Sequence, residues 1–313
     1  MEDKPLVSFC LFTYNQENFV RDALQGALSQ DYDNMEIVVS DDCSTDKTYD
    51  VIKEILKNYH GSHKIVINRN EHNLGIAGNV NKVLYTIAKG EIIVLAAGDD
   101  VSMPTRVSVS VDFLQLHPEV TSLSFASVLV DKNLNKIPAS PGRLLNIKNN
   151  TILTLEDYVY NCFSFLLFSG DSRVLRRSVI DAFPPLEYVE AEDIYLFIRS
   201  LYIGSIAYIR QPLVLYRQHN DSVMNKERNK TLEEKKKDRE EYEDKKDVRK
   251  QLEADLDWAI KHNYVSSEQK KIIIKKINWI EDILIPRVPI THSNLYNKTK
   301  YIVREIARFI FRE

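Results

Sequence analysis

Pairs of carboxylates follow two apolar runs in the first hundred residues: Asp41 with Asp42, and Asp99 with Asp100 after Gly98. Mg²⁺ and Mn²⁺ prefer carboxylate oxygens, and their sites commonly combine one or two carboxylates with substrate phosphates. A cation held by the second pair would neutralise a departing diphosphate. The alternative is an ordinary surface turn, because Gly and Asp are frequent turn residues.

The first pair allows two interpretations. It belongs to a helix N-cap, for which Ser44, Thr45 or Asp46 would serve, or it binds a ligand. One cap needs one side chain, and adjacent carboxylates repel each other where the dielectric constant is low. Asp42 as an acceptor for a base or ribose donor explains the pair better, although spacing alone leaves both interpretations open.

Three other segments carry polar groups of interest. Asn73 and Gly75 lie in a loop that opens a helix, where backbone N–H groups meet a ligand or a cap. Glu192 and Asp193 begin a helical stripe, where acids stabilise the helix dipole or supply a base for an acceptor hydroxyl. His219 is either a surface histidine or a ligand of a metal or phosphate.

Apolar runs of strand length alternate with stripes of helical spacing over the first hundred residues. We expect strands at 6–12, 36–40, 64–67 and 91–97, with helices between them, and a later helix at about 174–182. This alternation predicts an α/β fold with parallel strands, in which functional groups collect beyond the carboxyl ends of the strands. The segments TYNQ, DDCSTD and GDD after the first, second and fourth strands lie at that edge.

The composition changes after the first two-thirds of the chain. Residues 225–250 hold eleven Lys or Arg and nine Asp or Glu, which indicates a solvated helix or a connector. Helical stripes follow around 252–260 and 272–285. We therefore predict a catalytic domain over 1–224 and a charged helical extension over 225–313.

Charge and cysteine usage narrow the functional class. The net charge of −3 gives no support to nucleic-acid binding. Three cysteines without metal-ligand spacing argue against disulfides and structural zinc, and favour a reducing cytosol. Neither a signal peptide nor an apolar run long enough to span a membrane is recognisable, so we expect a cytoplasmic protein.

The last stretch, residues 295–313, has the pattern of an interfacial amphipathic helix. Arg304, Arg308 and Arg312 share one face, because they recur every four residues. We expect peripheral contact with the inner face of the cell membrane, the alternative being a helix that packs its apolar stripe on the preceding segment.

In their order along the chain, the motifs resemble those of family-2 glycosyltransferases, which have the nucleotide-binding glycosyltransferase A fold. They are Val7-Ser8-Phe9 leading to Thr13-Tyr14-Asn15, Asp41-Asp42-Cys43-Ser44-Thr45-Asp46, Asn73-Leu74-Gly75, Gly98-Asp99-Asp100, Glu192-Asp193 and Tyr216-Arg217-Gln218-His219. The ordered set covers roughly residues 5–224 and is far more specific than any one motif. The resemblance implies a Rossmann-like, mostly parallel sheet flanked by helices.

The resemblance also implies a nucleotide site. Tyr14 and Asp42 would contact the base, usually uracil, and Asp99 would lie near the ribose or the metal. Asn73 would belong to the same site through its loop. Phe12 would too, although it occupies a position where the family frequently has a small polar residue.

The remaining roles implied by the resemblance concern metal and catalysis. Asp100 would ligate Mn²⁺ or Mg²⁺, and His219 would help to hold the metal or the diphosphate. The GDD segment lacks the first carboxylate of a literal Asp-x-Asp. Asp193 would deprotonate the acceptor hydroxyl in a single in-line displacement that inverts the anomeric carbon.

The resulting expectation is an inverting, metal-dependent glycosyltransferase that uses a UDP-sugar and a glycan acceptor, lipid-linked in capsule or O-antigen synthesis. A non-catalytic nucleotide-sugar-binding module would need neither Asp100 nor Asp193, so their presence favours an enzyme. A sugar nucleotidyltransferase would carry a Gly-rich basic loop after the first strand, where this chain has TYNQEN. A dinucleotide-binding protein would have GxGxxG there.

Overall fold

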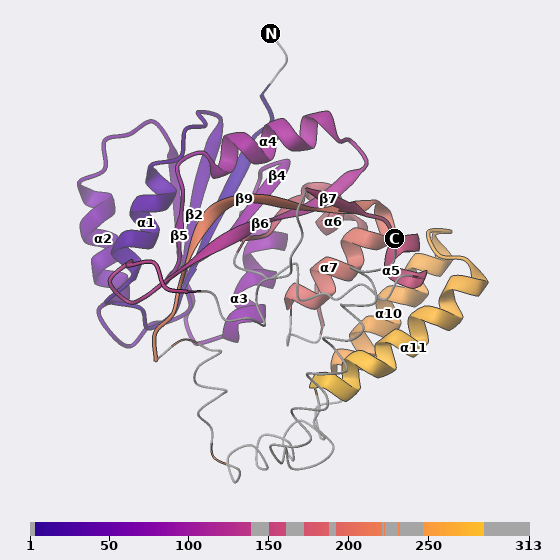
Figure 1. Cartoon of the computed structure of the whole chain (residues 1–313). Coiled ribbons are helices and arrows are strands. Elements are labelled where there is room, and N and C mark those ends of the chain that lie inside the picture. Colours follow the sequence, from indigo (N-terminus) through magenta and orange to yellow (C-terminus); the bar gives the residue numbers. More distant parts are fainter. Residues whose placement is uncertain are drawn as a thin grey trace. The chain divides into compact units, whose positions relative to one another are not determined.

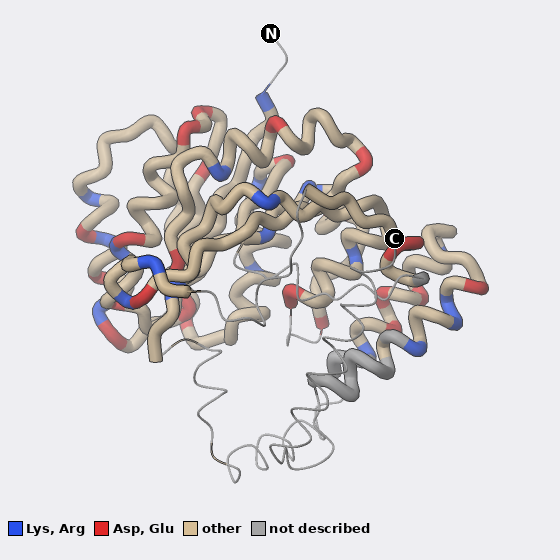
Figure 2. Tube along the Cα trace, viewed as in Figure 1, with Lys and Arg blue, Asp and Glu red and all other residues tan. Residues whose placement is uncertain are grey.

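The computed structural model describes residues 4–138, 150–160, 172–187, 192–220, 222, 231 and 247–284 (Figure 1). They divide into two compact units. The first contains the described residues up to 152 and those from 172 to 219. The second contains residues 153–160 and the described residues from 220 onward. Lys and Arg are interspersed with Asp and Glu along the described trace (Figure 2).

A nine-stranded sheet forms the centre of the first unit, in the order β3-β2-β1-β4-β8-β6-β9-β5 with β7 paired to β9. The strands are β1 Val7–Thr13, β2 Met35–Asp41, β3 Lys64–Arg69, β4 Ile92–Ala97, β5 Val101–Ser102, β6 Val120–Val130, β7 Thr151–Leu153, β8 Val174–Arg176 and β9 Ser205–Arg217. Pairs within β3-β2-β1-β4 are parallel, as is β6 with β9, whereas β8 is antiparallel to both its neighbours and β5 is antiparallel to β9. The expected α/β fold with a mostly parallel sheet is confirmed.

Helices cover both faces of this sheet (Figure 1). They are α1 Val20–Leu28, α2 Thr48–Lys57, α3 Gly75–Lys82 with its continuation η1 Val83–Ile87, α4 Arg106–Leu116, α6 Arg177–Ala182 and α7 Glu192–Ile203. Alternate side chains of β1 point to opposite faces. Phe9 and Leu11 pack in one core with α1, α2 and α4, while Cys10 packs in the other with α3, α6 and α7.

The carboxyl ends of the first four strands are level. Thr13 at the end of β1 pairs with Asp41 at the end of β2, and Asp41 pairs with Arg69 at the end of β3. Phe12 pairs with Ala97, the last residue of β4. The loops that follow these strands therefore start side by side, at the edge where functional groups of such sheets collect.

The helix expected at 174–182 begins three residues later than the sequence predicts. The stretch 174–182 reads as a single helix in sequence, but its first three residues form β8 and the helix α6 begins at Arg177. Val174 pairs with Val94 of β4 and with Leu123 of β6, which bridges the two parallel parts of the sheet. Tertiary pairing has overridden the local helical pattern.

The second unit is helical. It contains α5 Leu155–Tyr160, α10 Asp247–Lys261 and α11 Ser267–Leu284, so the helical stripes expected there are confirmed. Leu252, Leu256 and Ile273 are buried in it. The domain boundary at 224/225 remains a prediction, and residues 295–313 lie outside the described residues. No helix in the described part of the chain is both long and apolar enough to cross a bilayer.

Candidate functional site

The loops after β1 and β2 are bound to each other by backbone-to-side-chain hydrogen bonds. Asn15, which has a left-handed φ of 50°, donates its N–H to Ser44 Oγ at 3.0 Å. Its side-chain oxygen accepts the N–H of Thr45 at 2.8 Å. Gln16 N donates to Thr48 Oγ1 at 2.6 Å. These bonds hold both loops as one rigid rim at the carboxyl end of the sheet.

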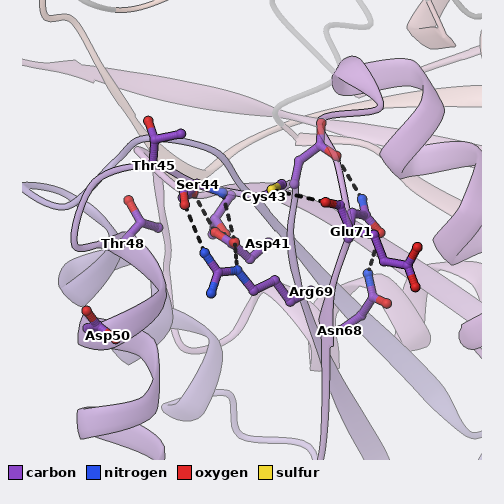
Figure 3. Close-up of polar contacts among 12 residues, drawn as sticks. Asp41, Cys43, Ser44, Thr45, Thr48, Asp50, Asn68, Arg69 and Glu71 are labelled. Carbon is purple, nitrogen blue, oxygen red and sulfur yellow. Dashed lines mark hydrogen bonds and ion pairs between the residues drawn. The ribbon is translucent and has the colours of Figure 1, made fainter.

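The Asp41 carboxylate is engaged by hydrogen bonds within this local structure (Figure 3). Its carboxylate is 1% exposed and accepts Ser44 N at 3.0 Å and Ser44 Oγ at 2.5 Å. Thr13 Oγ1 donates to it at 3.3 Å, and Arg69 Nε lies 3.4 Å away. Cys43 has a left-handed φ of 61°. The two carboxylates that precede it bond to different neighbours, Asp41 to Ser44 and Asp42 to Asn70. Asp41 therefore shapes the loop.

Asp42 is bonded on one oxygen only. It is 3% exposed, and its Oδ1 accepts Asn70 Nδ2 and Leu74 N, each at 2.8 Å. Its Oδ2 has no hydrogen bond to any described residue. Of the residues considered as a helix cap, Asp46 bonds to the start of α2: its Oδ1 accepts the N–H of Thr48, the first residue of that helix, at 2.9 Å. Asp42 thus keeps one acceptor oxygen for a ligand.

Three other predicted nucleotide-site residues lie at or after the carboxyl ends of β1 and β3. Phe12 is half-buried at the end of β1, and Tyr14 directly after β1 is 41% exposed. Asn73 Oδ1 accepts Gly75 N at 2.7 Å, so this side chain closes a tight turn at the start of α3. Gly75 has φ of 75°, which favours glycine. Nucleotide contacts by these residues remain predictions.

The GDD segment and His219 come together. Asp99 Oδ2 lies 3.0 Å from His219 Nε2, and the two side chains are 18% and 7% exposed. Asp100 Oδ1 accepts the backbone N–H of Arg217 at 2.8 Å, and Arg217 Nε donates to the Asp99 carbonyl at 2.9 Å. The end of β9 therefore places His219 against the loop that follows β4, although more than a hundred residues separate them in sequence.

Arg217 is the organising residue of this group, and sequence reasoning gave it no role. Its side chain is 1% exposed, and its terminal nitrogens donate to the Lys132 carbonyl at 2.8 Å and to Asp22 Oδ2 at 2.7 Å. Its guanidinium lies 4.9 Å from the ring centre of Phe19, and that ring lies 4.2 Å from the ring of His219. Arg217 thereby joins α1, β9 and the GDD segment.

The donor chemistry of this group fits a hard divalent cation. The two carboxylates of Asp99 and Asp100 supply oxygen ligands, and a cation that is also bound by substrate phosphates needs only one or two of these from the protein. In the described part of the chain, no group of three or more His, Cys, Asp and Glu side chains is close enough to hold a metal without such help.

Glu192 and Asp193 occupy the first turn of α7. Burial, and then the charge of Asp193, raise the pKa of Glu192 to about 7, while the charge of Arg173 acts in the opposite direction. The Arg173 carbonyl accepts the N–H of Leu95, next to the carboxyl end of β4. The role of Asp193 as base remains a prediction.

The sequence analysis also gave no role to Asn70. It follows β3 directly, and it is buried beneath Asp42 with 3% of its surface exposed. The rule that ligand-binding groups follow the strand ends was applied to the first, second and fourth strands. Applied to the third strand, the same rule points to Asn70.

Comparison with known proteins gives a consistent result. The family model described as Glycosyl transferase family 2 matches residues 8–183, more than half of the chain. An uncharacterized glycosyltransferase of Haemophilus influenzae is 28% identical over 241 residues, covering 74% of this chain and 72% of the relative. The UDP-Glc:alpha-D-GlcNAc-diphosphoundecaprenol beta-1,3-glucosyltransferase WfaP of Escherichia coli is 33% identical over 128 residues, covering 41% of this chain and 48% of WfaP.

Among solved structures, S. aureus TarS in complex with UDP-GlcNAc matches with a TM-score of 0.55 and 21% identity, covering 70% of this chain and 60% of that chain. At this identity the match bears on the fold alone, and it confirms the expected glycosyltransferase A fold. The chain spans about half the length of WfaP and less than two-thirds of the TarS chain.

Proposed function

The chain belongs to glycosyltransferase family 2, and on this premise we propose that it transfers a sugar from a UDP-sugar to a hydroxyl group of a glycan acceptor with inversion. One observation carries the donor site: Asp42 is buried, its Oδ1 accepts two hydrogen bonds, and its Oδ2 accepts none from the residues that the structure describes. An ionised carboxylate can only accept hydrogen bonds, which suits the ring N–H of uracil. Tyr14, one loop away, offers an aromatic face to the same base.

The acceptor side of the proposal draws on a relative. WfaP is named for a UDP-glucose donor and a diphosphoundecaprenol-linked acceptor, and it shares 33% identity with this chain over 128 residues. A lipid-linked acceptor in the synthesis of a surface polysaccharide, such as capsule or O-antigen, is therefore proposed here. The sequence pattern of residues 295–313 fits that acceptor, because a basic amphipathic segment would bring a cytoplasmic enzyme to the inner membrane face.

In the proposed reaction, the acceptor oxygen attacks the anomeric carbon while the bond from that carbon to the diphosphate oxygen breaks. Asp193 takes the proton of the acceptor hydroxyl, a contribution of typically ~10²–10⁴-fold in rate. A single displacement with one carboxylate base inverts the anomeric centre. Asp99, Asp100 and His219 would hold Mn²⁺ or Mg²⁺, which when bound neutralises charge on the departing diphosphate.

Thermal unfolding with nucleotides tests the donor site. UDP with Mn²⁺ should stabilise the folded chain by about 2.7 kcal/mol at a hundredfold excess over the dissociation constant. Asp42→Asn should abolish that shift, whereas Asp33→Asn, at a side chain that is 90% exposed, should leave it unchanged. Asp100→Ala should remove the part that depends on the metal.

Two results would contradict the proposal in different ways. An equal UDP shift in Mn²⁺ and in EDTA would remove the metal from the account while leaving the nucleotide site. The absence of any shift with UDP, GDP or dTDP would remove the nucleotide site itself.

A further inference from the structure

The side-chain amide of Asn70 can lie only one way round. Its Nδ2 is 2.8 Å from Asp42 Oδ1, and its Oδ1 is 2.8 Å from Lys82 Nζ. A carboxylate only accepts hydrogen bonds and an ammonium group only donates them. The two charged partners therefore fix the NH₂ group toward Asp42 and the oxygen toward Lys82.

The rest of this amide is also engaged. Its second N–H donates to Asn79 Oδ1 at 3.1 Å, and its oxygen also accepts Asn68 Nδ2 at 3.0 Å. Asn79 is held in turn by Ser40 Oγ at 2.6 Å. The cluster joins β2, β3 and α3. A buried polar network in which every position of the central amide is used holds that amide rigidly.

From this arrangement we propose that Asn70 and Lys82 are positioning residues that make Asp42 select the nucleobase. The Lys82 ammonium pulls electron density toward the oxygen of Asn70, which strengthens the N–H that Asn70 donates to Asp42 Oδ1. Together with Leu74 N, that donor fixes Oδ1 and leaves Oδ2 as the acceptor oxygen without a hydrogen bond among the described residues.

The acceptor chemistry of Asp42 Oδ2 distinguishes bases. Uracil presents a ring N–H between two carbonyls and can donate to Asp42 Oδ2, whereas cytosine has an acceptor nitrogen at the same ring position, which a carboxylate repels. The relay of hydrogen bonds from Lys82 through Asn70 to Asp42 would therefore favour UDP over CDP. This inference rests on the proposed function, because it requires Asp42 to meet the base.

A purely structural cluster makes a different prediction. If Lys82 and Asn70 only join β3 to α3, then removing the Lys82 ammonium lowers the unfolding temperature and leaves the preference between UDP and CDP unchanged. Base preference is therefore the decisive measurement, and stability alone is not.

The test is calorimetric titration of the full chain with UDP and with CDP in the presence of Mn²⁺. Lys82→Met should weaken UDP binding by about tenfold, the effect of losing a hydrogen bond to a charged group, and should change CDP binding much less. Lys82→Arg, which keeps a cationic donor, should restore most of the preference. Lys57→Met is the matched control, because Lys57 also ends its helix but is exposed, and it should behave as the wild type.

Asn70→Asp keeps the size of the side chain but places a second carboxylate against Asp42. It should weaken UDP binding more than Lys82→Met does. If that variant does not fold, Lys82→Met decides alone. A wild type that prefers UDP, together with a Lys82→Met variant of unchanged preference, would overturn the relay and leave the proposed function intact. A wild type that binds neither nucleotide would overturn the proposed function, and the relay with it.

Discussion

Replacing Arg217 by Met tests how the GDD segment is held. The Met side chain is unbranched and replaces the aliphatic part of the buried Arg side chain, but it donates no hydrogen bonds. The Lys132 carbonyl and the Asp99 carbonyl would each lose a donor, and Asp22 would lose its ion-pair partner at 2.7 Å. The backbone bond from Arg217 N to Asp100 would be retained, because it does not involve the side chain.

The structure sets the size of the effect. Breaking a buried pair by removing one partner costs about 3–5 kcal/mol. Asp22 is 38% exposed and can be resolvated by water, which reduces its share, whereas the Arg217 side chain is 1% exposed. We therefore expect the free energy of unfolding to fall by about 3 kcal/mol. At roughly 2–4 °C for each kcal/mol in a domain of this size, the unfolding temperature should drop by about 6–12 °C.

The assay is thermal unfolding followed by circular dichroism, with Arg21→Met as the matched control. Arg21 is one residue from Asp22 and forms an ion pair with Glu54 at 3.0 Å, but the two side chains are 47% and 62% exposed. Exposed pairs contribute at most about 1 kcal/mol. If Arg217→Met lowers the unfolding temperature no more than Arg21→Met does, Arg217 does not organise this part of the fold.

Three further outcomes are expected. Asp193→Asn should leave UDP binding unchanged and reduce sugar transfer by at least ~10²-fold, and transfer at the wild-type rate would move the base to another carboxylate. The folded-state pKa of Glu192, about 7, lies above the ordinary value of 4.5, so its stabilisation is present below pH 4.5 and is lost as the pH rises toward 7. Glu192→Gln should therefore reduce the decline in unfolding temperature across that pH window, and parallel curves for the two proteins would refute the shift. The full chain should float with anionic vesicles at low salt while a chain ending at Asn294 should not, and equal flotation of the two would remove residues 295–313 from membrane contact.

The sequence predicted which edge of the sheet carries the candidate site, because the alternation of strand and helix patterns determines where the strands end. Alternating strands and helices predict parallel pairing, and parallel pairing places every strand end on one side. Asp42 and Asp99 could be identified in this way. The local pattern also allowed a cap and a ligand role for Asn73, and the structure shows its side chain closing a turn before α3.

Other features depend on contacts between distant segments, which no local pattern contains. β8 has only three residues, and it forms because β4 and β6 pair with it on either side. Arg217 donates a hydrogen bond to Asp22, which lies 195 residues away in the sequence. Lys82, the last residue of α3, donates to Asn70 directly after β3. Sequence spacing contains no information on these contacts, although the four hydrogen-bond acceptors around the backbone N–H and side chain of Arg217 are evident once the fold is known.

Product stereochemistry tests the proposed transfer most directly. The full chain would be incubated with Mn²⁺, an α-linked UDP-sugar and a lipid-linked GlcNAc-diphosphate acceptor, and the anomeric proton of the product would be read by NMR. Inverting transfer by Asp193 predicts a β-linked product, formed together with UDP and absent from the Asp193→Asn reaction. An α-linked product, or UDP release that yields only free sugar, would contradict it.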